Sequence, residues 1–157
     1  MERILSDVQC NRLILQSKSS NWERVDRYGK YEQTFVEDED ILSSVKKYFN
    51  KEVVSKPIIK ILKFNTGDNI PTFSADYSNK QDEYFKRYTG TNFIVQTYLN
   101  SNFEGGILTI GKQVIRPKTG YGITQNKTDK CSISKVEKGT AFLLFVFISK
   151  IKTIELL

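Results

Sequence analysis

The sequence predicts an α+β fold that is mainly β, in which N-terminal helices pack on a β-sandwich or jelly roll. Helical periodicity is confined to the first 50 residues, and many short strand-like segments follow. Ten Phe and eight Tyr suit pleated β surfaces. Residues 141–148 are nearly all apolar, as expected of a strand that is buried on both faces. These three observations together favour a β-rich core over a helical bundle.

The composition indicates one folded domain over residues 1–157. The chain is 39% hydrophobic and 12% aromatic, and it has neither an internal repeat nor a flexible linker. A chain of this length buries a hydrophobic core without the help of disulfides.

Two helices are expected before residue 50. Ser6, with Gln9 three residues later, forms a capping-box pattern, and Cys10 and Leu13 follow at helical spacing. The second helix follows acidic residues 37–40, which suit the positive end of a helix dipole. Its apolar stripe consists of Ile41, Leu42, Val45, Tyr48 and Phe49.

Extended segments are expected from residue 28 onward. The clearest is 92–99, in which apolar and β-branched residues alternate on one face. Gly105-Gly106 marks a tight turn, and polar loops are expected at 65–71 and 78–90. The expected strands are 28–36, 58–64, 92–99, 107–110, 113–115, 120–124, 133–136 and 141–148.

The chain contains no histidine and only two cysteines, Cys10 and Cys131. A Ser-His-Asp triad, a Cys-His dyad, a histidine-based metal site and a Cys₄ zinc site are therefore excluded. Two cysteines argue against a disulfide framework and fit a reducing compartment. The start has no signal-peptide pattern, and no apolar run reaches the roughly 20 residues of a membrane span. We expect a cytoplasmic or intracellular protein that does not cross a membrane.

The formal net charge of +6 leaves a nucleic-acid-binding protein as one alternative. The lysines are scattered along the chain without a long run, which is more typical of a solvated surface. Nucleic acid therefore stays an alternative partner, but it is not the favoured one.

Several segments resemble those of a known family in their order and spacing. Thr97 to Gly106 (TYLNSNFEGG) resembles a strand end that is followed by a polar turn and FEGG. Val114 to Gly120 (VIRPKTG) resembles a V-x-P-K-x-G segment, and Val136 to Thr140 (VEKGT) resembles a V-x-x-G-x piece. Phe64 to Asp68 (FNTGD) resembles a Tyr-x-x-Gly entry to a metal-binding strand, and Leu5 to Ile14 resembles a first helix.

The family with these segments is the 2-oxoglutarate/iron(II) oxygenases of the prolyl 4-hydroxylase type, which the chain resembles over most of its length. The resemblance implies a double-stranded β-helix, the jelly roll of that family. It also implies iron(II) held by two histidines and one carboxylate, with the other positions open to 2-oxoglutarate and dioxygen.

The resemblance allows two registers for the family's H-x-D motif. With one inserted residue, which we prefer, Ser74-Ala75-Asp76 takes its place, so the carboxylate is kept and a serine replaces the histidine. Without the insertion, Phe73 and Ala75 take these positions and both ligands are lost.

The family's second histidine corresponds to Cys131, and its basic anchor for 2-oxoglutarate corresponds to Ala141. The resemblance therefore makes Ser74, Asp76 and Cys131 a degenerate metal site and Ala141 a degenerate cosubstrate anchor. A serine, a carboxylate and a protonated thiol would hold metal weakly. A buried dicarboxylate without a basic partner would be destabilised by lost hydration.

Each of these residues also has a structural interpretation. Asp76 is either a remaining metal ligand or a loop carboxylate that caps backbone N–H groups. Cys131 is either a redox or metal-binding thiol or a small buried apolar residue. Ser74 has no histidine to activate it, so only a Ser-Lys pair remains for it. The former pocket is either filled or open to another small molecule; its expected aromatic residues are Phe64, Phe73, Phe93 and Tyr98.

The sequence thus predicts a catalytically inactive oxygenase-like protein, not an enzyme and without cofactor or metal, that serves as a protein-binding or structural module. The expected partner is a protein or further copies of the chain. The Lys-, Asn- and Ile-rich composition suits an AT-rich genome, and a large DNA virus is one candidate source, with a role in the virion or as a host-directed decoy. The alternatives are an active oxygenase with non-standard ligands that include Asp76 and Cys131, and the basic nucleic-acid-binding protein.

Overall fold

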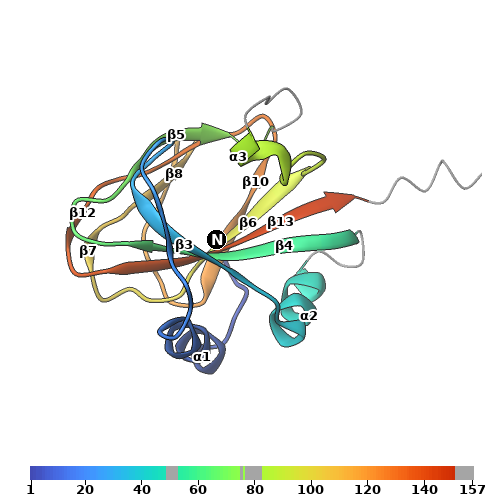
Figure 1. Cartoon of the computed structure of the whole chain (residues 1–157), viewed down its shortest axis with the longest axis horizontal. Coiled ribbons are helices and arrows are strands. Elements are labelled where there is room, and N and C mark those ends of the chain that lie inside the picture. Colours follow the sequence, from blue (N-terminus) through green and yellow to red (C-terminus); the bar gives the residue numbers. More distant parts are fainter. Residues whose placement is uncertain (49–52, 75, 77–82, 151–157) are drawn as a thin grey trace, which may run out of the picture.

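The computed structural model describes residues 1–48, 53–74, 76 and 83–150. A larger and a smaller β-sheet face each other, and two helices cover the outer face of the larger sheet (Figure 1). The mainly β jelly roll with helices packed on one sheet, which the sequence predicts, is confirmed.

The larger sheet has seven antiparallel strands in the order β1-β10-β6-β13-β4-β3-β2. Its centre is β13, which pairs with β6 on one side and with β4 on the other. The bounds are β1 Glu2–Arg3, β2 Glu23–Val25, β3 Tyr31–Val36, β4 Val53–Phe64, β6 Phe93–Tyr98, β10 Tyr121–Asn126 and β13 Ala141–Lys150.

The smaller sheet has four antiparallel strands in the order β5-β11-β8-β9, and β12 pairs with β7 beside it. The bounds are β5 Ile70–Ser74, β7 Glu104–Gly105, β8 Leu108–Ile110, β9 Gln113–Ile115, β11 Lys130–Ile133 and β12 Val136–Lys138.

The first helix, α1 (Asp7–Ser17), begins where the sequence predicts. Ser6 Oγ accepts a hydrogen bond from the Gln9 backbone N–H, and the Gln9 side chain accepts one from the Ser6 N–H, which completes the capping box. The second helix is α2 (Glu39–Tyr48), and a single turn, α3 (Glu83–Lys86), lies in the expected loop region. No helix in the described ranges is long and apolar enough to span a bilayer.

Two apolar cores lie on the two faces of the larger sheet. Successive strand residues point to opposite faces, so β13 contributes Leu144 and Val146 to the outer core and Leu143 and Phe145 to the inner core. The predicted burial of this strand on both faces is confirmed. The outer core joins the helices to the sheet through residues that include Cys10, Leu13, Ile41, Val45, Ile59, Ile61 and Val95.

The tight turn predicted at Gly105-Gly106 is wrong, because Gly105 lies in strand β7 and Gly106 N donates to Lys135 O, a distant segment. Both glycines have positive φ angles, 79° and 60°, in the region that glycine adopts without strain. A Cβ on Gly105 would lie 2.2 Å from the backbone O of Lys135. Close approach of two backbone segments therefore requires glycine here.

Several predicted strand boundaries are wrong. The strand expected at 28–36 begins at Tyr31, and β5 begins at Ile70, inside the loop expected at 65–71. The expected strand 133–136 is divided, because the backbone changes partners: Ser134 N donates to Ile107 O, whereas Val136 N donates to Asp68 O. The strand expected to begin at residue 58 begins at Val53 and includes Pro57, which lies where the β4–β13 register shifts; a proline is tolerated at such an irregularity. Phe49 and residues 78–82, also part of the predictions, lie outside the described residues.

Candidate functional site

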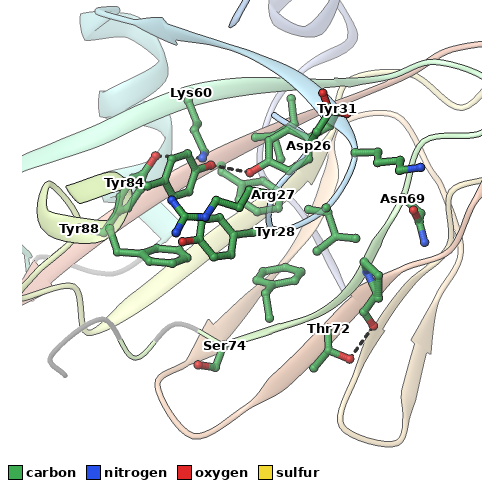
Figure 2. Close-up of a pocket in the computed structure, with 18 of the residues that line it drawn as sticks. Asp26, Arg27, Tyr28, Tyr31, Lys60, Asn69, Thr72, Ser74, Tyr84 and Tyr88 are labelled. Atoms are coloured by element: carbon green, nitrogen blue, oxygen red, sulfur yellow. Dashed lines mark hydrogen bonds between the residues drawn. The ribbon is translucent and has the colours of Figure 1, made fainter. Parts of the chain in front are cut away.

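A pocket of about 480 Å³ lies between the two sheets, where segment 26–31, β5 and α3 meet (Figure 2). Its inner wall is formed by β4 and β13, through Lys60, Leu62, Phe145 and Phe147. The pocket therefore reaches from the surface into the barrel interior.

Lys60 enters the barrel because it shares the inward face of β4 with Leu62 and Phe64. Its side chain is only 3% exposed. Its Nζ donates to Gln33 Oε1 at 2.8 Å and to Tyr88 OH at 2.9 Å. Among the described residues, no carboxylate lies within salt-bridge distance of this Nζ. An ammonium has three N–H donors, so one donor remains for a ligand.

Aromatic rings surround the Lys60 ammonium. The Nζ lies 4.9 Å from the ring centroid of Tyr88, 5.3 Å from that of Phe147, 5.8 Å from that of Tyr31 and 5.9 Å from that of Tyr84. These distances allow cation–π attraction. Figure 2 shows Lys60 reaching from its strand toward Tyr84 and Tyr88.

Burial lowers the pKa of Lys60 from 10.5 to about 7. That value includes two smaller effects: the positive charge of Arg87 lowers the pKa, and the carboxylate of Glu23 raises it. A lysine with such a pKa changes charge near neutral pH, as catalytic lysines do.

Hydroxyl and amide groups hold the ring cluster in place. Tyr31 OH and Tyr84 OH are 2.7 Å apart, and Tyr84 OH donates to Gln33 Oε1 at 3.4 Å. Gln33 Nε2 in turn donates to Glu23 Oε2 at 3.3 Å. Burial raises the pKa of Tyr84, so this phenol stays neutral.

The structure separates the predicted metal-site residues Ser74 and Cys131. Cys131 pairs with Phe73 across β11 and β5, whereas Ser74 pairs with Lys130. Directly opposite residues of an antiparallel pair share one face, so Phe73 lies on the inward face with Cys131. Both registers of the H-x-D motif stay predictions, and Ala75 lies outside the described residues.

Asp76 is half-buried just beyond β5, and Ser74 lines the pocket. Ala141, the predicted anchor position, is fully buried opposite Phe64 and does not line the pocket. The interpretation of Ser74, Asp76, Cys131 and Ala141 as degenerate positions stays a prediction.

Of the aromatic residues expected to fill the former pocket, Phe64 and Tyr98 belong to the inner core. Phe73 is half-buried and lines the pocket, where its ring stacks on Phe145 at 6.0 Å between centroids. Phe93 belongs to the outer core, because it lies on the other face of β6. The interior is therefore filled in one part and hollow in another.

Iron(II), which the fold implies, does not fit the residues that the structure describes. No cluster of three or more His, Cys, Asp or Glu side chains suited to a metal occurs among them. Burial raises the pKa of the Cys131 thiol to about 12, which keeps it protonated and a poor ligand. We therefore assign no chemical step to iron.

Lys60 is the candidate functional residue that the sequence-based reasoning missed. The alternation that predicts a strand at 58–64 also places Lys60 on the same side as Ile58, Leu62 and Phe64. A lysine on an otherwise apolar face was the available signal, because lysine is almost never fully buried without a reason.

No protein-family model and no curated protein matches the sequence, but solved structures share its fold. The viral collagen prolyl hydroxylase of Paramecium Bursaria Chlorella virus-1, in its 2OG complex, matches with a TM-score of 0.66 at 17% identity, over 96% of this chain and 94% of that one. A Pseudomonas putida prolyl-4-hydroxylase matches with a TM-score of 0.71 at 8% identity, over 97% and 91%. A cupin 2 conserved barrel domain protein from Rhodopseudomonas palustris matches with a TM-score of 0.54 at 4% identity, over 85% and 75%.

These similarities correct two predictions. The predictions that the chain is not an enzyme and has no cofactor are contradicted, because the matching structures include hydroxylases, one of them in its 2OG complex. The physical reason for the error is that missing histidines remove one set of metal ligands, whereas the barrel keeps a pocket with a buried cation. The chain has the fold shared by prolyl 4-hydroxylase-like 2-oxoglutarate/iron(II) oxygenases and cupin-fold proteins.

Proposed function

We propose that this chain is an enzyme of the oxygenase fold that acts on a small carboxylate-bearing compound, such as a 2-oxo acid, bound in the pocket around Lys60. One observation carries the proposal: Lys60 presents a buried ammonium to the pocket, without a carboxylate partner among the described residues. A buried charge is costly unless it is paired. A ligand carboxylate would supply the missing charge.

The position of Lys60 also suits catalysis. Its two fixed partners, Gln33 and Tyr88, are themselves buried and hold the ammonium in one orientation. A preorganised cation in a site with little water stabilises negative charge on a bound compound more strongly than a mobile surface lysine does.

The test is calorimetric titration at pH 6.5 of two 2-oxo acids, 2-oxoglutarate and phenylpyruvate, into the wild type and Lys60→Met. Charge-assisted hydrogen bonds contribute about 1.5–3 kcal/mol, so we expect affinity to fall by roughly tenfold or more in the variant. Binding of neither acid by the wild type, or equal binding by Lys60→Met, would reject the proposal.

The matched control is Lys63→Met. Lys63 is on the same strand but faces outward, with its Nζ 5.3 Å from the Trp22 ring and 4.0 Å from Glu32. We expect this variant to bind like the wild type. Chromatography of each acid after incubation with and without added iron(II) then measures turnover and any metal requirement directly, and a bound acid that is never converted would overturn the enzymatic part.

A protein partner, an assembly of copies, a viral source and an intracellular location stay predictions from the sequence.

A further inference from the structure

The walls of the pocket are aromatic. Tyr88 and Phe147 stack with centroids 4.3 Å apart beside Lys60, and Phe73 and Phe145 stack on the side of β5. Toward segment 26–31, the ring of Tyr28 lies 5.2 Å from that of Tyr84 and 4.5 Å from that of Phe85. A compound bound at the Lys60 ammonium would therefore lie between rings.

The charges of the pocket are unevenly placed. Among its described lining residues, Lys60 is the only charged side chain that is buried. The other charged lining residues, Asp26, Arg27 and Lys30, are exposed. Among the described lining residues, the interior thus offers one buried cation, and the two further cations, Arg27 and Lys30, lie at the exposed mouth.

This arrangement treats two kinds of acid differently. A dicarboxylate with one carboxylate at Lys60 would place the other against rings, where it would lose hydration, or toward Arg27 and Lys30 at the exposed mouth, where water weakens an ion pair. An aromatic monocarboxylate would place its one charge at Lys60 and its ring against the pocket walls, where offset and edge-to-face contacts are favourable.

We infer that the pocket selects a small monocarboxylate with an aromatic body over an aliphatic dicarboxylate such as 2-oxoglutarate. This inference rests on the proposed function and names its ligand class. Tyr88 has two roles in it, because its hydroxyl positions the Lys60 ammonium and its ring forms part of the wall.

The experiment compares three 2-oxo acids that share one head group and differ in the tail. At pH 6.5, wild-type protein is titrated with phenylpyruvate (an aromatic tail), 2-oxohexanoate (an uncharged aliphatic tail) and 2-oxoglutarate (a charged tail). We expect phenylpyruvate to bind on the order of tenfold more tightly than 2-oxoglutarate, with 2-oxohexanoate between them.

A pair of variants on β13 tests the role of the walls. Phe147→Leu removes a ring beside Lys60, and Phe142→Leu removes a ring from the opposite face of the strand, where Phe142 packs on the outer core. We expect the preference for phenylpyruvate over 2-oxohexanoate to fall severalfold in Phe147→Leu and to stay unchanged in Phe142→Leu.

The two proposals fail in different ways. If 2-oxoglutarate or 2-oxohexanoate binds the wild type as tightly as phenylpyruvate, the inference is overturned and the proposed function stands. If none of the three acids binds, both are overturned. These outcomes need only wild-type protein, so they hold even where a variant does not fold.

Discussion

The two ends of the barrel interior are built from the same strands, but one end is closely packed and the other contains a pocket. At one end, Ala141 of β13 lies opposite Phe64 of β4, and both are fully buried in close-packed core. Four residues along, Phe145 lies opposite Lys60, and here the interior is hollow and holds a cation. One end is closed by packing, and the other is open to a ligand.

At the closed end, the buried hydroxyl of Tyr98 is also paired by hydrogen bonds within the protein. Tyr98 OH donates to Gly106 O at 2.8 Å and accepts from Leu108 N at 3.0 Å, and burial raises the pKa of this phenol. The sequence resemblance places the cosubstrate anchor at Ala141, at this closed end. The difference between the ends teaches that close packing around Ala141 does not extend to the pocket around Lys60.

The largest expected effect comes from placing a guanidinium at each end. Ala141→Arg forces a charge into packed core and should lower the free energy of unfolding by about 3–5 kcal/mol or prevent folding. Lys60→Arg places the same group beside the pocket, where there is room. This variant should lower the free energy of unfolding by only about 1 kcal/mol. Urea unfolding measures both, and equal losses would contradict the distinction between a closed and an open end.

A smaller effect concerns the pH dependence of stability at the open end. The folded pKa of Lys60, about 7, is below its ordinary value of 10.5. The unfolded chain therefore binds more protons between these two values, and stability rises with pH across that window. Lys60→Met removes this titration, so its stability relative to the wild type should be greater at pH 6 than at pH 9, by on the order of 2 kcal/mol. Urea unfolding of both proteins at the two pH values measures this, with Lys63→Met as the control that should show no such change.

The smallest effect is a test of closure without any mutation. Burial raises the pKa of Cys131 to about 12 and that of Cys10 to about 11. Both thiols should resist iodoacetamide at pH 8 in folded protein and react after denaturation, as intact-mass measurement would show. Rapid labelling of Cys131 in folded protein would indicate that the interior beside Phe73 opens to solvent.

Local signals in the sequence predicted the elements well. The Ser6–Gln9 capping box, the apolar stripe through Ile41 and Val45, and the run 141–148 all predict what the structure contains, because each depends on neighbours in the chain. The strand boundaries at 133–136 and before Pro57 were predicted wrongly because they do not depend on neighbours in the chain. Each boundary is set by pairing with a distant segment.

For the candidate site, the sequence by itself determined which chemistry is absent, because composition alone excludes a histidine-based metal site. The order and periodicity of its segments also predicted helices on a β-sandwich or jelly roll, and the family resemblance implied the jelly roll. Only the tertiary structure decided that Phe73 lies opposite Cys131, and that Lys60, Tyr88 and Phe147 meet at one pocket. These residues are far apart in the chain, and their meeting depends on strand register and on which parts of the interior are filled, neither of which a local pattern specifies.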